Sequence, residues 1–369
     1  ESYLPDATFQ SIVIGDFLTI GSIHLVLLND EYVRGDSLDI EQLFKVPDVT
    51  SDVNEMTSTV LSQMREALRI VKSDSSDTVL NCFNPKDCPC LNLCHPNLPQ
   101  YSIYNIPNLT PKKRRELEEA KTIAIDDVDL NFSFTPKQQK IVDVMQSKTP
   151  FIDKLTILSL LHGLIYPLYF LDYETYDEAI PLYKGHKPYQ KMVFQYSLHI
   201  VSSNSQDTQH EEYVAIEPGD PARELVKHLQ KHISGTGSVI VWNKAFEGGR
   251  NREMVEQYPE YKDFLTDVNN RMFDLMEIVS KGYYVHPDFR GSWSIKNVLP
   301  VMVPELNYKD LSINKGDMAM IAWWDMVHSQ STEVKKKTID SLLKYCGLDT
   351  MAMVKILEKL KLSEKLLDF

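Results

Sequence analysis

The chain has 369 residues, of which 43% are hydrophobic and 25% are charged, an ordinary balance for a globular protein. This length allows two or three domains, and the composition excludes a disordered or fibrous protein. The formal net charge of −13 at pH 7 argues against a protein that coats duplex nucleic acid through one large basic face. A nuclease stays compatible with this charge, because metal ions in its site supply positive charge where phosphate must lie.

The first part of the chain predicts helices separated by one apolar strand. Residues 8–28 are rich in β-branched and large apolar side chains and predict a helix or strand followed by a buried strand. A polar helix is expected over residues 51–73. Two threonine–proline pairs, at 110–111 and 135–136, each match a helix cap followed by the first helical position. Two further helices are therefore expected to begin at these prolines.

Four of the five cysteines fall within the 13 residues from 82 to 94. Cysteines confined to one short segment of a large chain indicate a metal site more than a disulfide framework. Their spacing differs from the C-x-x-C pairs of a zinc ribbon. The alternative is a set of reduced cysteines in a loop. The four residues are Cys82, Cys88, Cys90 and Cys94.

From about residue 166 the sequence alternates between strand and helix patterns, and from Met272 onward it is mostly helical. The expected strands are 166–174, 192–201, 211–216 and 238–242, and the expected helices are 220–234, 247–258 and 338–360. This part therefore predicts an α/β unit with a mixed sheet.

The apolar stretch 156–171 is too short and too interrupted for a membrane helix, so we expect no membrane span and a cytoplasmic protein. The chain starts without Met and without a signal-peptide pattern. We expect it to be processed or to begin partway through a longer protein.

Acidic residues follow two of these strands and lie on the last helix. Asp172 and Glu174 are two residues apart on a strand, so their side chains point to one face. A lone D-x-E would indicate a strand end emerging into solvent. Here, however, Glu247 follows another strand, and Tyr345 and Asp349 lie four apart on one helical face. Acids at these places are what a two-metal phosphodiester hydrolase needs, because shared carboxylates must hold two divalent ions close together.

The segments "FLDYETYD", "VWNKAFE" and "LLKYCGLDT" resemble, in this order, the three motifs of the DnaQ-like (DEDD) 3′–5′ exonucleases of the ribonuclease H-like fold. The Y-x-x-x-D form of the third motif is similar to the DEDDy branch. The flanking "YPLYFLDYET", "PYQKMVFQYSLH", "GSWSIKNVLP" and "YCGLDTMAMV" resemble more narrowly an uncharacterised exonuclease-type domain found behind RecB-like nucleases in bacteria. The resemblance covers about residues 166–362.

This resemblance implies a metal-dependent 3′–5′ exonuclease that acts on single-stranded DNA or RNA ends. Tyr345 would orient the attacking water. The implied ligands of two Mg²⁺ or Mn²⁺ ions are Asp172, Glu174, Glu247 and Asp349. The second motif usually carries Asp, so Asp274 is an alternative ligand whose other expected role is at a helix start. The alternatives are a catalytically degenerate nucleic-acid-binding or scaffold module and a phosphodiesterase acting on a small nucleotide.

Residues 6–36 resemble the end of a RecB-like nuclease core, in which a glutamine, here Gln10, follows the catalytic residues. No E-x-K precedes Gln10, so the resemblance implies a remnant without catalysis. RecB-like nucleases related to the CRISPR-associated group often hold an iron–sulfur cluster, which implies an iron–sulfur or zinc site at the four clustered cysteines. Cys346 is expected to pack against the sheet.

The expected domains are a RecB-like remnant (1–75), a Cys-rich metal-binding segment with a helical connector (76–150) and a DnaQ-like exonuclease domain (151–369).

Overall fold

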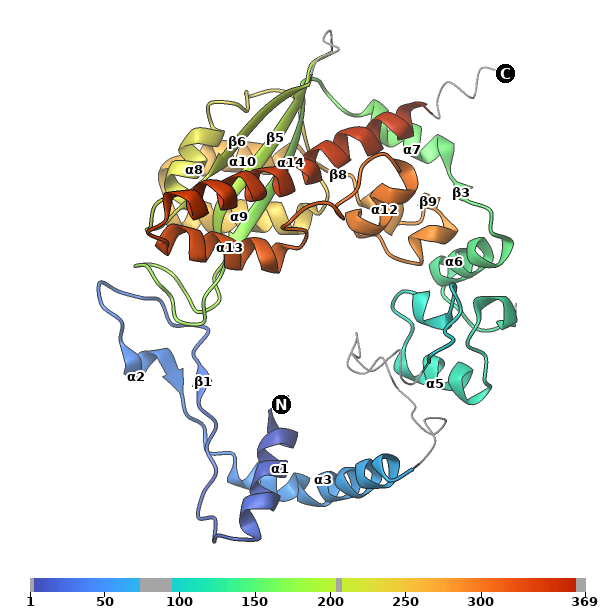
Figure 1. The fold of residues 1–369 in the computed structure, drawn as a ribbon, viewed down its shortest axis with the longest axis vertical. Coiled ribbons are helices and arrows are strands. Elements are labelled where there is room, and N and C mark those ends of the chain that lie inside the picture. Colours follow the sequence, from blue (N-terminus) through green and yellow to red (C-terminus); the bar gives the residue numbers. More distant parts are fainter. Residues whose placement is uncertain (1–2, 74–94, 130, 204–207, 363–369) are drawn as a thin grey trace. The chain divides into compact units, whose positions relative to one another are not determined.

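The computed structural model describes residues 3–73, 95–129, 131–203 and 208–362, and it is a mixed α/β protein (Figure 1). The chain divides into two compact units. The first comprises Glu1–Leu98, Pro111–Ala120 and Glu178–Gln190, and the second comprises Pro99–Thr110, Lys121–Asp177 and Lys191–Phe369.

The first unit is built mainly from helices. Its elements are α1 (Leu4–Gly15), β1 (Leu27–Leu28), α2 (Ile40–Leu43), β2 (Phe44–Lys45), α3 (Thr50–Val71) and α5 (Pro111–Glu119). Helices α1 and α3 pack against each other, and β1 pairs antiparallel with β2. The segment Glu178–Gln190 joins this unit through a hydrogen bond of 2.8 Å from Arg34 Nη1 to the carbonyl oxygen of Pro181. The helix expected over 51–73 is confirmed.

The buried strand expected before residue 28 is wrong. Strand β1 has only two residues, Leu27 and Leu28, and both are half-buried. Val26 is 65% exposed. Among the described residues, only β2 pairs with β1. Within the described part of the first unit, the apolar run therefore has no second sheet layer to bury it, although its composition alone favours a core strand.

The second unit holds a five-stranded sheet with helices on both faces. Its helices are α6 (Pro136–Ser147), α7 (Lys154–His162), α8 (Ala222–Leu229), α9 (Lys244–Gln257), α10 (Lys262–Asn270), α11 (Glu277–Ser280), α12 (Ile295–Met302), α13 (Gly316–His328) and α14 (Thr332–Leu362). Its strands are β3 (Phe151–Ile152), β4 (Leu168–Tyr176), β5 (Met192–Val201), β6 (Gln209–Val214), β7 (Ser238–Val241), β8 (Met272–Asp274) and β9 (Tyr284–Val285). The expected cap of α6 is confirmed, because Thr135 Oγ1 accepts a hydrogen bond from the amide of Gln138.

The sheet has the order β6-β5-β4-β7-β8, and β5 alone runs opposite to the other strands. The predicted mixed sheet is therefore confirmed. Strands β4, β7 and β8 are parallel neighbours, so their carboxyl ends meet at one edge. Strand β8 was not expected, because Met272 was assigned to a helical region. A strand of three residues is too short for its periodicity to be recognised.

The two faces of the sheet carry different side chains. Tyr169, Leu171 and Tyr173 of β4 join the apolar core formed with α8, α9 and α10. The alternating residues of β4, which include Asp172 and Glu174, face the opposite side. Helix α14 crosses that side of the sheet (Figure 1) and packs on β4 and β5.

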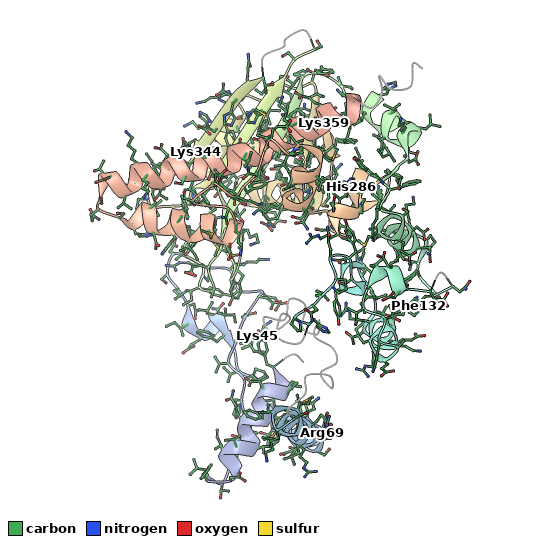
Figure 2. The ribbon with its side chains drawn as sticks, turned by 45° about the vertical axis from the view of Figure 1, so that its right-hand side comes forward. Lys45, Arg69, Phe132, His286, Lys344 and Lys359 are labelled. Carbon is green, nitrogen blue, oxygen red and sulfur yellow. The ribbon has the colours of Figure 1, made fainter. Side chains whose placement is uncertain are left out.

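Helix α14 combines an apolar inner face with an exposed charged face. Lys344 and Lys359 lie on the exposed face and are marked in Figure 2. Over the ranges that the structure describes, no helix is both long enough and apolar enough to cross a membrane.

Candidate functional site

Asp172 and Glu174 occupy successive positions on the α14-facing side of β4. Glu174 is buried, and Asp172 is half-buried. The pairing of β4 with β5 shifts register directly after Glu174. The two acids therefore lie where the regular ladder is interrupted, and their predicted shared face is confirmed.

Helix α14 brings Tyr345 and Asp349 to the same side, and both are buried. The helix is fixed to the sheet by two contacts. Gln195 Nε2 donates a hydrogen bond of 2.8 Å to the carbonyl oxygen of Leu342, and the hydroxyls of Ser197 and Thr350 lie 2.7 Å apart. These contacts hold Asp349 beside β4, since β5 is the direct neighbour of that strand.

Glu247 enters the site from the first turn of α9. Its expected place at a strand end is corrected, because α9 begins at Lys244, directly after β7 and the capping Asn243. Glu247 is only 3% exposed. Its Oε2 atom has no hydrogen-bond partner among the described residues. The free amides of a first helical turn favour an acid at this place.

The charges of Asp349 and Glu247 act on the two acids of β4. Burial raises the pKa of Asp172, and the charges of Asp349, Glu174 and Glu247 raise it further. Burial and the charge of Asp349 also raise the pKa of Glu174. Burial raises the pKa of Asp349 to about 6 and that of Glu247 to about 8. The structure thus places Asp349 and Glu247 near enough to raise the pKa of Asp172 and Glu174, while of the four acids only Asp172 and Glu174 belong to the described group of ligand atoms within 4.8 Å of one another.

Asp274 ends β8 and has a different role. Its Oδ2 accepts a hydrogen bond of 3.1 Å from the amide of Lys244. It therefore lies at the start of α9, and the backbone amides of Met276 and Glu277 at the start of α11 also lower its pKa, so the expected helix-start role is found at both helices. Its charge raises the pKa of Glu247, whereas Glu247 acts on Asp172 and Glu174. Glu247 is accordingly the member of this pair that belongs to the acid cluster.

Two site residues were missed by the sequence analysis. Lys296 Nζ donates hydrogen bonds to the hydroxyl of Tyr345 at 3.0 Å and to the carbonyl oxygen of Asn314 at 2.8 Å. The hydroxyl of Tyr308 donates a hydrogen bond of 2.6 Å to Oδ1 of Asp349. Lys296 lies in the segment "GSWSIKNVLP", and the family resemblance of that segment could have pointed to it. Tyr308 lies in no quoted motif.

Cys346 is fully buried, as expected for a residue packed against the sheet, and it also borders the acids. Its Sγ lies 3.4 Å from Oδ2 of Asp172. Burial, followed by the nearby charge of Asp172, raises the pKa of this thiol. Asp172, Glu174 and Cys346 each offer one ligand atom, and these atoms all lie within 4.8 Å of one another. The other four cysteines, Cys82, Cys88, Cys90 and Cys94, lie outside the described residues.

The donor set fits divalent cations. Carboxylate oxygens are the ligands that Mg²⁺ and Mn²⁺ prefer. The buried Oε2 atom of Glu247 has a free lone pair for such an ion. Buried acids that raise one another's pKa are costly to ionise together, and a bound cation removes that cost. The residues that would hold the ions are Asp172, Glu174, Glu247 and Asp349.

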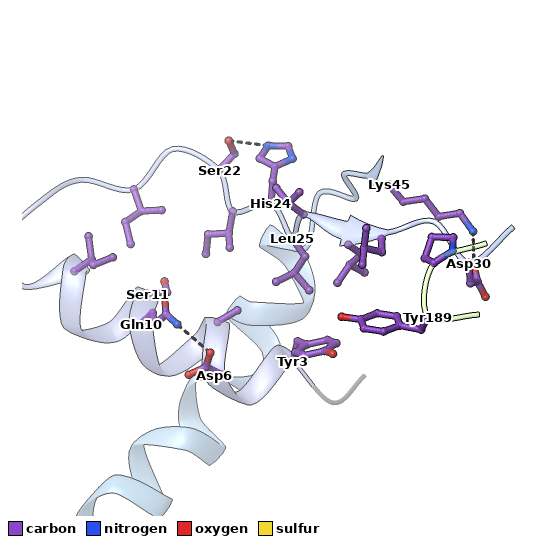
Figure 3. A pocket seen from close by; sticks show the side chains of 18 residues that line it. Tyr3, Asp6, Gln10, Ser11, Ser22, His24, Leu25, Asp30, Lys45 and Tyr189 are labelled. Atoms are coloured by element: carbon purple, nitrogen blue, oxygen red, sulfur yellow. Dashed lines mark hydrogen bonds and ion pairs between the residues drawn. The ribbon is translucent and has the colours of Figure 1, made fainter. Parts of the chain in front are cut away.

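A separate hollow of about 950 Å³ lies in the first unit, along α1 and residues 20–30 (Figure 3). Gln10, the residue of the RecB-like resemblance, lines it, and its amide donates a hydrogen bond of 2.9 Å to Oδ2 of Asp6. Lys45 at the rim forms an ion pair with Asp30 (Figure 3). None of the four clustered acids lines this hollow.

Comparison with known proteins gives a family without an assigned role. Residues 169–294 match the family described as "Domain of unknown function (DUF2779)", a match that includes Asp172, Glu174 and Glu247. The chain is also similar to "Uncharacterized protein UU173" of Ureaplasma parvum serovar 3, with 29% identity over 208 residues. That alignment covers 51% of this chain and 30% of the relative, so the chain spans less than a third of the relative's length. No solved structure matches.

Proposed function

We propose that the second unit is a metal-dependent 3′–5′ exonuclease of the DnaQ-like type. The observation that carries this proposal is the acid cluster itself. Glu247 from α9 and Asp349 from α14 lie close enough to Asp172 and Glu174 of β4 to raise the pKa of both. Tyr345 stands one helical turn before Asp349, as the DEDDy pattern requires.

We also propose that the sheet is of the ribonuclease H-like type. The order β6-β5-β4-β7-β8, with β5 alone reversed, supports this assignment. The first acids lie on the central strand, β4, and the last acid lies on a helix that packs across it. No role in hydrolysis is assigned to the first unit.

The residues of the site have distinct tasks. Two divalent ions held by the carboxylates would activate water and stabilise the leaving oxygen. The hydroxyl oxygen of Tyr345 accepts a hydrogen bond from Lys296, so its own hydrogen is left to donate to the attacking water or to a phosphate oxygen. Tyr308 holds Asp349 in one orientation.

The proposed substrate is the 3′ end of a single-stranded DNA or RNA in the cytoplasm. A chain with net charge −13 repels phosphate over long range, so the ions and Lys296 must supply the positive charge at the point of cleavage. An end threaded to the acids also fits the unstacked state of single strands, whose backbone is accessible to a narrow site.

A labelled oligonucleotide incubated with Mn²⁺ tests the proposal. The wild-type protein should release mononucleotides from the 3′ end, and EDTA or Asp172→Asn should abolish the release because a metal ligand is lost. Asp325→Asn makes the same chemical change at an exposed position of α13 and should retain activity. Hydrolysis of small nucleotides alone would favour the phosphodiesterase, and binding without any product would favour the degenerate module. Full activity in Asp172→Asn would contradict the two-metal site.

A further inference from the structure

The acid cluster contains a sulfur atom that a site for hard cations does not need. Cys346 lies on α14 between Tyr345 and Asp349, and its side chain points to β4. Its Sγ lies 3.4 Å from Oδ2 of Asp172, and an oxygen of Glu174 completes a group whose atoms all lie within 4.8 Å.

These separations suit a particular class of metal ion. In a tetrahedral zinc site with sulfur at about 2.3 Å and oxygen at about 2.0 Å from the metal, the sulfur and oxygen ligands lie about 3.5 Å apart. The observed separation of 3.4 Å between the thiol and Asp172 is close to that value. Mg²⁺ takes oxygen ligands in an octahedron and selects against thiolate, whereas Zn²⁺ accepts both sulfur and carboxylate oxygen.

A further buried carboxylate lies near this group on α9. Glu247 is 97% buried, and its Oε2 atom makes no hydrogen bond within the described part of the chain. The charge of Glu247 raises the pKa of both Asp172 and Glu174, so its carboxylate lies near these two acids. A buried carboxylate oxygen without a partner requires an explanation, and a bound cation is one that this donor set fits.

We propose that Cys346, Asp172 and Glu174, beside the buried carboxylate of Glu247, form a binding site for a thiophilic divalent ion of the Zn²⁺ class. On binding, the sulfur–metal bond forms, the S–H proton passes to solvent, and the ion loses water ligands. The inference rests on the acid cluster of the proposed function but not on hydrolysis. Because the same carboxylates would serve Mg²⁺ or Mn²⁺, Zn²⁺ competes with these ions.

Cadmium, a spectroscopic substitute for zinc, provides the test. The cadmium NMR shift depends on the number of sulfur ligands, so an ion bound by one sulfur and several oxygens resonates apart from an ion bound by several of the other cysteines. Titration of the full chain with Cd²⁺ should give a one-sulfur resonance. This resonance should be lost in Cys346→Ser and in Asp172→Asn. The second variant keeps all five thiols, so its loss of signal identifies the joint site.

Absence of the one-sulfur resonance in the wild-type chain, or its persistence in either variant, overturns the proposal. Circular dichroism checks the fold of each variant, and Cys346→Ala with Asp172→Asn decides the matter if Cys346→Ser does not fold. If the chain hydrolyses a substrate in the presence of Mn²⁺, Zn²⁺ should inhibit this hydrolysis. In Cys346→Ala, the same inhibition should need at least tenfold more Zn²⁺. A chain without hydrolysis would refute the exonuclease while the NMR result still decides the metal site.

Discussion

The ammonium group of Lys296 lies 3.0 Å from the hydroxyl of Tyr345 and joins α12 to α14 at the acid cluster. It also lies 5.0 Å from the ring centre of Tyr345 and 5.6 Å from that of Tyr308. Its charge lowers the pKa of both Glu174 and Asp349. This lysine therefore both orients the phenol and favours the ionised form of the neighbouring acids.

Lys296→Met should shift the pH dependence of metal binding to higher pH. Without the ammonium group, the pKa values of Glu174 and Asp349 rise, so protons compete with the metal over a wider range. Calorimetric titration with Mn²⁺ should show affinity several-fold weaker than wild type near pH 6, the pKa of Asp349, with the difference closing at higher pH. Lys296→Arg keeps the charge and should stay close to the wild-type profile. If the pH midpoint of Mn²⁺ binding is unchanged in Lys296→Met, the lysine contributes to packing alone.

Tyr345→Phe should lower kcat by roughly 10–100-fold with little change in KM, because a phenol that orients the attacking group acts mainly in the transition state. Single-turnover assays on the oligonucleotide measure this separately from binding. An unchanged kcat would reduce Tyr345 to a packing residue.

Tyr308→Phe is the matched phenol-to-phenyl change. It removes the hydrogen bond of 2.6 Å to Asp349, so the pKa of that acid rises and metal affinity should fall. Loss of a buried hydrogen bond to a charged group should also cost about 1.5–3 kcal/mol of unfolding free energy. The two substitutions should thus have different effects, with Tyr345→Phe lowering turnover and Tyr308→Phe lowering metal affinity.

The residues that the sequence identified are those whose position follows from local spacing. Asp172 and Glu174 share a face because a strand has a period of two, and Tyr345 and Asp349 share one because they are four apart on a helix. The order of the motifs along the chain then indicated that these residues lie close together in the folded protein.

The missed residues follow from long-range packing. Lys296 and Tyr308 meet α14 because α12 and the segment after it fold against that helix. Lys296 and Tyr345 are 49 positions apart in sequence, and Tyr308 and Asp349 are 41 positions apart. No periodic pattern encodes contacts over such separations. The prediction of a buried strand before residue 28 failed for a related reason, since the burial of a strand depends on which elements pack against it.

Gly237→Ala tests how closely β7 approaches β4. Gly237, directly before β7, has φ of +96°, and a Cβ atom there would lie 2.2 Å from the carbonyl oxygen of Pro167. The substitution should destabilise the protein by at least about 1–3 kcal/mol in chemical denaturation. Gly235→Ala is the control, because nothing lies within 4 Å of its added Cβ atom, and it should change stability by less than about 0.5 kcal/mol. Equal effects of the two changes would contradict the close approach.

The metal-free protein should lose stability as pH rises through the range in which its acids ionise. Burial raises the pKa of Glu247 from 4.5 to about 8, so between these values the folded state binds more protons than the unfolded state. The unfolding free energy therefore falls with increasing pH across this window and levels off above about pH 8. The group's contribution is fully present below pH 4.5 and is lost as pH passes the folded pKa.

Glu247→Gln should flatten this dependence and stabilise the metal-free protein at pH 8 and above by on the order of a few kcal/mol, because the amide carries no charge to bury. Urea denaturation at several pH values in EDTA measures the effect, with Asp325→Asn as an exposed-carboxylate control that should keep the wild-type slope. Added Mn²⁺ should restore stability at high pH in the wild type far more than in Glu247→Gln, since the ion binds the ionised carboxylate. Equal stabilisation of both proteins by Mn²⁺ would remove Glu247 from the metal site and leave Asp274 as the acid to substitute next.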